Sequence, residues 1–178
     1  MRLFIAFDVS EDVHKILESV QSKIKFSGSC SKTKDFHLTL KFLGEVEDSK
    51  LESLKRALDS VSFSPFEAHL TGIGAFPSKS NARVVWVGLE PKDKIDSVQK
   101  QFDDITLKLG FATDKEFHPH LTLVRIKFID NRKEFENMFD NLKVPECSFK
   151  IDSFKLIKST LTPQGPVYEV LKDFPARQ

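Results

Sequence analysis

The tetrapeptide His-Leu-Thr-Leu occurs twice in this chain, at residues 37–40 and 120–123, and it limits the possible folds more than any other feature. The copies lie 83 residues apart in a chain of 178, so each half contains one. Both stand among alternating polar and apolar residues, which predicts β-strands over 36–43 and 117–128. Side chains two residues apart on a strand point the same way, so each strand should bury its leucines and present a histidine and a threonine on the other face.

That pair of side chains has a chemical use. An imidazole titrates near neutral pH and can give or take a proton, while a threonine hydroxyl can hydrogen-bond a phosphate oxygen. Facing each other across a cleft, His37 and His120 would supply one general acid and one general base, and Thr39 and Thr122 would supply two hydroxyl donors. Such a set suits phosphoryl transfer between oxygens without a metal. The residues alone leave open which histidine is the acid.

A third His-Leu-Thr occurs at residues 69–71 and is followed by Gly72 instead of leucine. It falls on the last element of the first half, and the corresponding stretch of the second half, 149–154, contains no histidine. We therefore interpret His69 and Thr71 as residues of a strand surface without a catalytic role.

Hydrophobic periodicity and capping signals predict the same order of elements in both halves, namely strand, helix, motif strand, helix, strand. For the first half we predict strands at 2–8, 36–43 and 66–76, a helix from a Ser10 cap to about residue 24, and a helix opened by a Ser49–Glu52 capping box. For the second half we predict strands at 83–87, 117–128, 148–157 and 167–171, helices at 94–109 and 132–142, and a turn at 161–166. Polar loops through Gly28 and through Gly110 and Asp114 should precede the motif strands. The repeated order indicates an internal duplication, and a pseudo-two-fold arrangement would bring the motif strands together in a single α+β domain spanning residues 1–178.

Composition restricts the classes of function. The net charge of +1 argues against a broad basic surface for nucleic acid, so any RNA contact should be local. No stretch of 18 or more apolar residues predicts a membrane span, and the two cysteines match no metal spacing. We expect a cytoplasmic protein with free thiols and no membrane partner.

Two cations lie close to the motifs. A guanidinium at Arg125 suits phosphate recognition, but strict alternation puts it on the face of Leu121 and Leu123, so it reaches the cleft only if the strand bulges. Lys41 shares its parity with His37 and could add positive potential, although a solvated strand lysine is the competing interpretation.

The pair His118 and His120 could in principle bind a metal, but no third ligand is evident. The duplication explains His120 without a metal, and we expect neither a metal nor a cofactor.

Among the 17 phenylalanines most fit core positions, including Phe4 and Phe42. One or two near the cleft could stack on a terminal base, and the pattern does not say which.

Six stretches carry a resemblance to a known family: 2–8, 36–44, 72–77, 84–88, 118–125 and 159–168. Through them the chain resembles the 2H phosphoesterases, which are defined by two His-x-Thr/Ser motifs. It is most similar to the RNA 2′,3′-cyclic phosphodiesterases of bacteria and archaea, formerly called 2′-5′ RNA ligases. The double motif together with the tail Ser159-Thr-Leu-Thr-Pro-Gln-Gly-Pro-Val-Tyr168 makes the resemblance specific.

The resemblance implies a bilobal α+β fold with two antiparallel sheets flanking a cleft and helices outside. It also implies hydrolysis of an RNA terminal 2′,3′-cyclic phosphate, such as a tRNA-derived end, to a 2′-phosphomonoester. In that scheme His37 protonates the leaving 3′ oxygen, His120 activates water, and Thr39 and Thr122 hold the phosphate. Reversal would join the cyclic phosphate to a 5′-hydroxyl without ATP as a side activity. We expect a monomer.

Two other functions remain open from the sequence. One is a 2H phosphodiesterase acting on a small cyclic nucleotide or a 2′,5′-linked substrate. The other is a non-catalytic module that binds RNA ends, although binding alone would not need a matched acid and base.

Overall fold

The computed structural model describes residues 1–113 and 116–177, so the predicted loop through Gly110 and Asp114 lies partly outside the described residues. In the first half the elements are β1 (Arg2–Asp8), α1 (Glu11–Ser22), β2 (Gly28–Lys32), β3 (His37–Glu45), η1 (Asp48–Lys50), α2 (Leu51–Leu58), β4 (Phe66–Phe76) and η2 (Lys79–Asn81). In the second half they are β5 (Val84–Glu90), α3 (Lys92–Lys108), β6 (His120–Ile129), α4 (Arg132–Asn141), β7 (Ser148–Ile151), β8 (Ser153–Thr162) and β9 (Gly165–Pro175).

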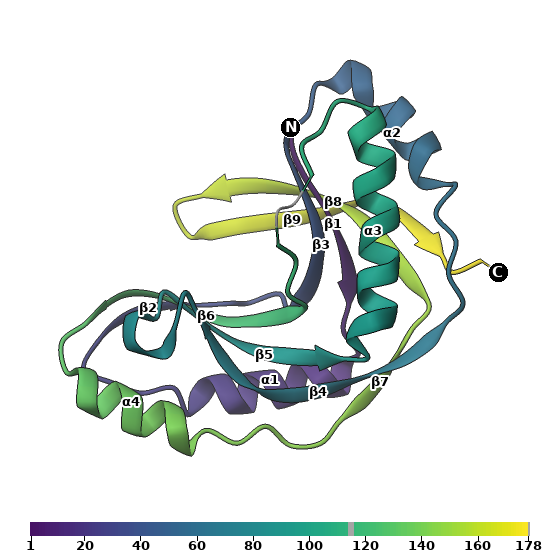
Figure 1. Ribbon diagram of the computed structural model, residues 1–178. Helices are drawn as coiled ribbons and strands as arrows, with labels where there is room; N and C mark the ends of the chain where they lie inside the picture. The colour runs from purple at the N-terminus through teal and green to yellow at the C-terminus, as the bar shows by residue number, and fades with distance from the viewer. Residues whose placement is uncertain (114–115, 178) are drawn as a thin grey trace.

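The strands form two antiparallel sheets that exchange strands between the halves (Figure 1). The four-stranded sheet has the order β3-β1-β8-β9, and the five-stranded sheet has the order β2-β6-β5-β4-β7. Each half therefore contributes its first strand and its motif strand to one sheet and a later strand to the other, since β8 pairs with β1 and β4 pairs with β5. The predicted α+β class, the duplicated halves and the two antiparallel sheets are confirmed.

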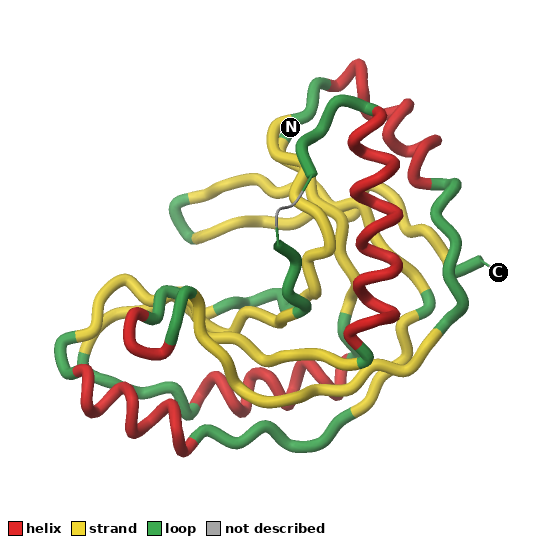
Figure 2. Tube along the Cα trace, in the orientation of Figure 1, coloured by secondary structure: helices red, strands yellow, loops and turns green. Residues whose placement is uncertain are grey.

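Each sheet carries helices on one side only. Figures 1 and 2 show α1 and α4 along the five-stranded sheet, and α2 and α3 beside the four-stranded sheet. The main apolar core lies between these layers, because the helices turn their apolar stripes inward, with Leu17 of α1 and Phe102 of α3 fully buried. All four motif leucines, at positions 38, 40, 121 and 123, belong to this core. The histidine and threonine of each motif consequently face the side that carries no helix.

Some predicted boundaries are wrong for local reasons. Ser10 caps α1 as expected, accepting from the Val13 amide at 3.3 Å. Ser49 caps nothing, because a 3₁₀ turn at Asp48–Lys50 comes first and α2 begins at Leu51 without a side-chain cap. The predicted loop through Gly28 is largely a strand, β2, which pairs with β6 at an edge of the five-stranded sheet.

The predicted strand over 148–157 is divided at Asp152. Its first part, β7, pairs with β4 in one sheet, while its second part, β8, pairs with β1 in the other. From there β8 and β9 continue as one long hairpin from Ser153 to Pro175, which shortens the predicted turn at 161–166. The alternation shifts by one residue at this point, because positions 149 and 151 are buried in β7 whereas positions 154 and 156 are buried in β8.

A bulge interrupts each motif strand at the last residue of the motif. In the β1–β3 pairing Thr39 lies opposite Ala6 while Lys41 lies opposite Ile5, so Leu40 is an extra residue. In the β5–β6 pairing Leu123 is extra in the same way, between the partners of Trp86 and Val85. An extra residue reverses the alternation of side chains beyond it.

Candidate active site

Strand pairing places the four motif side chains. His37 lies opposite Asp8 at the end of β1, and Thr39 lies opposite Ala6. On the other sheet His120 lies opposite Gly88, and Thr122 lies opposite Trp86. Strands β3 and β6 contact each other although they belong to different sheets, and all four motif side chains are half-buried. The structure thus brings the two predicted histidine–threonine pairs to neighbouring strands.

Each imidazole is anchored to the chain just before its strand. The Nδ1 of His37 lies 3.0 Å from the carbonyl oxygen of Asp35, and the Nδ1 of His120 lies 2.7 Å from that of His118. A carbonyl oxygen only accepts, so each ring donates through Nδ1–H. In its neutral form each ring then has an unprotonated Nε2, which is the nitrogen that can take up a proton.

Aromatic rings surround His37. Its ring centroid lies 4.9 Å from that of Phe4 and 5.2 Å from that of Tyr168, and Phe4 and Tyr168 contact each other at 5.3 Å. Tyr168 comes from β9, so the long hairpin contributes directly to this side of the site. Together with Ala6 and Ile157, these rings form a small apolar cluster on the face of the sheet that carries no helix.

His120 has an equivalent aromatic setting. Its centroid lies 4.9 Å from Phe76 and 6.1 Å from Trp86, whose rings contact each other at 4.9 Å. The indole lies so close over β4 that a Cβ at Gly74 would come within 2.1 Å of it, which is why a glycine is required there. Both histidines therefore sit against apolar rings instead of open water.

Burial among these rings lowers the pKa of both imidazoles, because it penalises the charged form. For His37 the hydrogen bond to Asp35 and the negative charges of Asp8 and Asp35 partly offset this decrease in pKa, and Arg125 adds to it. For His120 the hydrogen bond to His118 offsets the decrease, while the charges of His118 and Arg125 add to it. Burial also raises the pKa of Tyr168.

Arg125 reaches the face of the histidines because of the bulge in β6. After the extra Leu123, Val124 turns into the core and Arg125 becomes exposed on the side of His120 and Thr122. Its positive charge acts on His37 and His120, so it lies near both. The condition stated for Arg125 from the sequence, a bulge in this strand, is met.

The structure does not bring Lys41 to this face. The bulge at Leu40 turns the lysine toward α3, where its side chain is 1% exposed. Its Nζ donates to Asp103 at 2.5 Å and to the carbonyl oxygen of Ala112 at 2.7 Å. The prediction that Lys41 shares the parity of His37 and Thr39 is wrong, because it assumed an unbroken alternation.

The same bulge exposes an aromatic residue that the pattern assigned to the core. Phe42 is 60% exposed, and its ring lies 6.1 Å from that of Phe4. Phe42 follows His37 by five residues, as Arg125 follows His120 by five, so the two occupy equivalent places on the two strands. Phe4 is buried as predicted, but in the small cluster beside His37 and not in the main core. The positions of Phe42 and Phe4 were not predicted, because the prediction assumed strict alternation of side chains.

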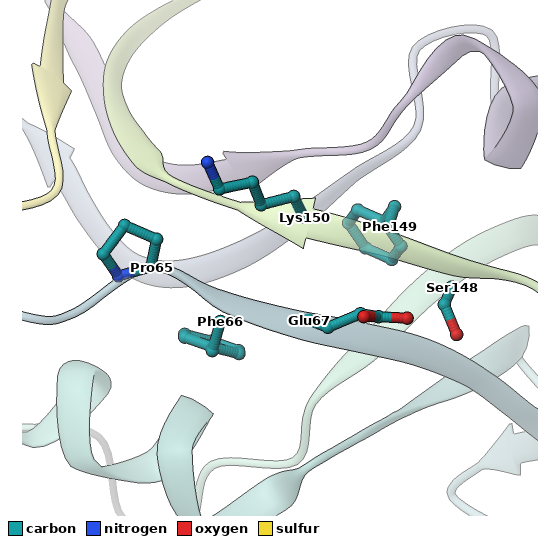
Figure 3. A pocket seen from close by; sticks show the side chains of 6 residues that line it. All are labelled: Pro65, Phe66, Glu67, Ser148, Phe149 and Lys150. Atoms are coloured by element: carbon teal, nitrogen blue, oxygen red, sulfur yellow. The ribbon is translucent and has the colours of Figure 1, made fainter.

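Two further findings concern possible metal ligands and a hollow away from the histidines. Within 1–113 and 116–177 no group of three or more His, Cys, Asp or Glu side chains could hold a metal ion. A hollow of about 400 Å³ lies at the outer edge of the five-stranded sheet, lined by residues of β4 and β7 that include Phe66, Glu67 and Lys150 (Figure 3). It contains no histidine, so it offers no group that titrates near neutral pH.

Comparison with known proteins identifies the family. The model of the LigT-like phosphoesterases matches the chain twice, over residues 7–86 and 87–168, so each half matches once. The chain belongs to this family. The family is part of the 2H phosphoesterase superfamily, and the chain is accordingly a phosphoesterase.

Several relatives cover nearly the whole chain. The chain is 38% identical to the RNA 2′,3′-cyclic phosphodiesterase of Methanocaldococcus jannaschii, with 98% of this chain and 100% of the relative covered. It is 35% identical to the protein of the same name from Archaeoglobus fulgidus, with 98% and 99% covered, and 33% identical to that from Thermotoga maritima, with 96% and 93% covered.

Solved structures show the same fold. The crystal structure of a Thermus thermophilus protein matches with a TM-score of 0.81 at 30% identity, covering 99% of this chain and 98% of that one. Escherichia coli LigT complexed with 3′-AMP matches with a TM-score of 0.80 at 24% identity over the same shares. Among the described residues no helix is long and apolar enough to span a membrane.

Proposed function

We propose that this phosphoesterase hydrolyses the 2′,3′-cyclic phosphate at an RNA end to a 2′-phosphomonoester without a metal, with His37 as the general acid and His120 as the general base. The observation that carries the proposal is the pair of imidazoles, each anchored through Nδ1, on equivalent strands with Arg125 near both. The substrate class is supported by relatives at 33–38% identity that bear this name.

The charges around the two rings favour this assignment of roles. Burial and Arg125 lower the pKa of both rings, but the carboxylates of Asp8 and Asp35 act on His37 alone, where they raise the pKa and favour the protonated form. Around His120 the neighbouring charges are those of His118 and Arg125, which lower its pKa and favour its neutral form. An acid must start protonated and a base must start neutral, so this asymmetry suits His37 as acid and His120 as base.

The chemical step is an in-line displacement at phosphorus. Nε2 of His120 takes a proton from water as the water oxygen bonds to phosphorus. The bond from phosphorus to the 3′ oxygen breaks, and that oxygen takes the proton from Nε2 of His37. The phosphate stays on the 2′ oxygen. Thr39, Thr122 and Arg125 would hold the non-bridging oxygens, where negative charge develops.

Exposed Phe42 supplies a surface for the terminal base. Any of the four bases can stack on an aromatic ring, and the ring of Phe42 lies on the same strand as His37 and Thr39.

The same chemical step with a 5′-hydroxyl in place of water would join two RNA ends through a 2′-5′ link without ATP. Hydrolysis should dominate, because water is in large excess.

The product of the reaction tests the proposal. The protein is incubated, with EDTA present, with an oligoribonucleotide that ends in a 2′,3′-cyclic phosphate, and the new end is identified. We expect a 2′-phosphate at a rate that EDTA does not change. A 3′-phosphate would mean that the other ring oxygen leaves. Inhibition by EDTA would contradict the metal-independent mechanism, and tight binding without turnover would favour the RNA-end binding module.

The size of the substrate is tested in the same assay. A mononucleoside 2′,3′-cyclic phosphate lacks every RNA contact beyond the terminal nucleoside. If the RNA end is the substrate, kcat/KM for the oligonucleotide should exceed that for the mononucleotide. An equal or higher value for the mononucleotide would favour the small cyclic nucleotide as the substrate.

A further inference from the structure

A second hollow, of about 250 Å³, lies beside His120 on the sheet face that carries no helix. Its lining includes Trp86, which contacts His120, and His118, whose carbonyl oxygen anchors that ring. It also includes Gly88, the strand partner of His120. The hollow therefore lies next to the residues that contact and pair with His120, the proposed base.

The third His-Leu-Thr sequence contributes to this hollow. The pairing of β4 with β5 is irregular between Leu70 and Ile73, and Thr71 lies there with its hydroxyl over Gly88. A Cβ at Gly88 would come within 2.4 Å of the Thr71 Oγ1, so the glycine allows the two strands to hold the hydroxyl in this place. The histidine of this copy, His69, is exposed and lies outside the lining. Thr71 thus has a position that a plain strand surface does not explain.

The chemistry of the lining suits a neutral, partly aromatic molecule. The rings of Trp86 and His118, 4.8 Å apart, and the apolar side chains of Leu89 and Pro119 provide contact area. Thr71 and Glu90 provide polar atoms, and Oε2 of Glu90 accepts a hydrogen bond from the backbone amide of Lys92. Because the ammonium of Lys92 is already paired with Asp96 and Glu90 is negative, the hollow does not favour a phosphate. Its volume is slightly below the range of about 300–1,000 Å³ that drug-sized ligands occupy, which suits one nucleoside.

In-line displacement determines which part of a substrate would reach this place. The entering oxygen approaches phosphorus from the side opposite the leaving oxygen, so it lies on the side of the base. When water is the nucleophile, no further group is attached to the entering oxygen. A 5′-hydroxyl carries a nucleoside, and this nucleoside would extend past His120 into the hollow.

We propose that the hollow lined by Thr71, Trp86, Glu90 and His118 binds the nucleoside whose 5′-hydroxyl attacks the cyclic phosphate when the enzyme joins two RNA ends. This rests on the proposed function. His120 takes the proton of the 5′-hydroxyl, the 5′ oxygen bonds to phosphorus, the bond to the 3′ oxygen breaks, and His37 protonates that oxygen. The hollow would then set the ratio of joining to hydrolysis without changing hydrolysis itself.

The test measures both products in one reaction. The donor is an oligoribonucleotide with a 2′,3′-cyclic phosphate, and the acceptor is a 5′-hydroxyl oligoribonucleotide with a blocked 3′ end. Thr71→Val removes the hydroxyl and keeps the shape, and Glu90→Gln removes the charge. His69→Ala, on the same strand outside the hollow, is the matched control. Hydrolysis without acceptor is measured for each protein and also reports on folding.

We expect Thr71→Val and Glu90→Gln each to lower the ratio of joined to hydrolysed product at least fivefold, with kcat/KM for hydrolysis changed less than twofold. His69→Ala should change neither. An unchanged ratio in both variants would overturn the inference, as would wild-type protein that hydrolyses the donor but joins nothing at saturating acceptor. A parallel loss of hydrolysis would overturn it too, because the hollow would then hold the donor. Wild-type protein without hydrolysis would instead refute the proposed function.

Discussion

Strands β3 and β6 carry the same tetrapeptide and the same bulge, yet they present different groups beyond it. In β3 the bulge buries Lys41 and exposes Phe42, whereas in β6 it buries Val124 and exposes Arg125. The shared part supplies two equivalent imidazole–hydroxyl pairs. The different part supplies an aromatic ring on one side and a guanidinium on the other. In the proposed function, duplication supplies the acid and the base, and divergence just beyond the motif supplies the contacts to the nucleotide.

Substitutions of the motif histidines should lower the activity most. His37→Ala and His120→Ala are each expected to lower kcat for the cyclic phosphate by about 10²–10⁴-fold, the usual contribution of a general acid or base. Thermal unfolding should change little, since both rings are half-buried at the surface of the site. His69→Ala, in the third copy, should retain full activity. Full activity in either of the first two variants would refute a two-histidine mechanism.

The residues beyond the bulge should affect different kinetic constants. Arg125→Ala removes a charge that would stabilise the phosphate in the transition state, and we expect kcat to fall about 10²-fold. It should also raise the pKa of both imidazoles, because Arg125 lowers each of them. Phe42→Ala should raise KM about tenfold through lost base stacking and leave kcat nearly unchanged. Equal effects of the two variants on kcat would remove the distinction between the strands.

Lys41, the buried residue that follows the bulge in β3, should contribute to stability and not to activity. Lys41→Met removes a buried ammonium that donates to Asp103, whose side chain is 17% exposed, and we expect the free energy of unfolding to fall by about 3 kcal/mol. Activity per folded molecule should be kept, because Lys41 points away from the site. Lys158→Met, which removes an exposed pair with Glu169, is the control and should unfold like the wild type. A loss of activity in folded Lys41→Met would return the lysine to the site.

The smallest expected effect is a shift in the pH dependence of kcat/KM. Asp8→Asn removes a charge that raises the pKa of His37, so that pKa should fall. As an acid, His37 must be protonated, and its pKa governs the loss of kcat/KM as pH rises. The alkaline limb of the profile should therefore move to lower pH, while the acidic limb, set by His120, stays in place. Lys155→Met, which releases Asp8 from its ion pair, should move the same limb to higher pH. A shift of the acidic limb in Asp8→Asn would exchange the two roles.

The sequence predicted what repetition makes visible. Two identical motifs in one element order implied the pairing of His37 with His120, because duplication places equivalent strands together. The bulge in β6 also left a trace, since Leu123 and Val124 are adjacent apolar residues that no strict alternation can bury on one face. The bulge in β3 left none. There Leu38, Leu40 and Phe42 alternate without a break, so the burial of Lys41 became visible only with Asp103 in place.

The hollow beside His120 could not be predicted for a similar reason. Thr71 and His118 are distant in sequence and come together through an irregular pairing of β4 with β5. The exchange of β4 and β8 between the halves was equally invisible, because alternation reports which face of a strand is buried and not which strand is its neighbour.

Opposite roles for the two equivalent histidines can be tested by comparing leaving groups. His37→Ala and His120→Ala are assayed on the RNA cyclic phosphate and on a nucleoside p-nitrophenyl phosphodiester, whose leaving phenolate needs no proton. Relative to wild type on each substrate, we expect His37→Ala to recover most of its rate on the aryl ester and His120→Ala to stay impaired. Equal impairment of both variants on both substrates, or recovery of His120→Ala alone, would contradict His37 as the acid and His120 as the base.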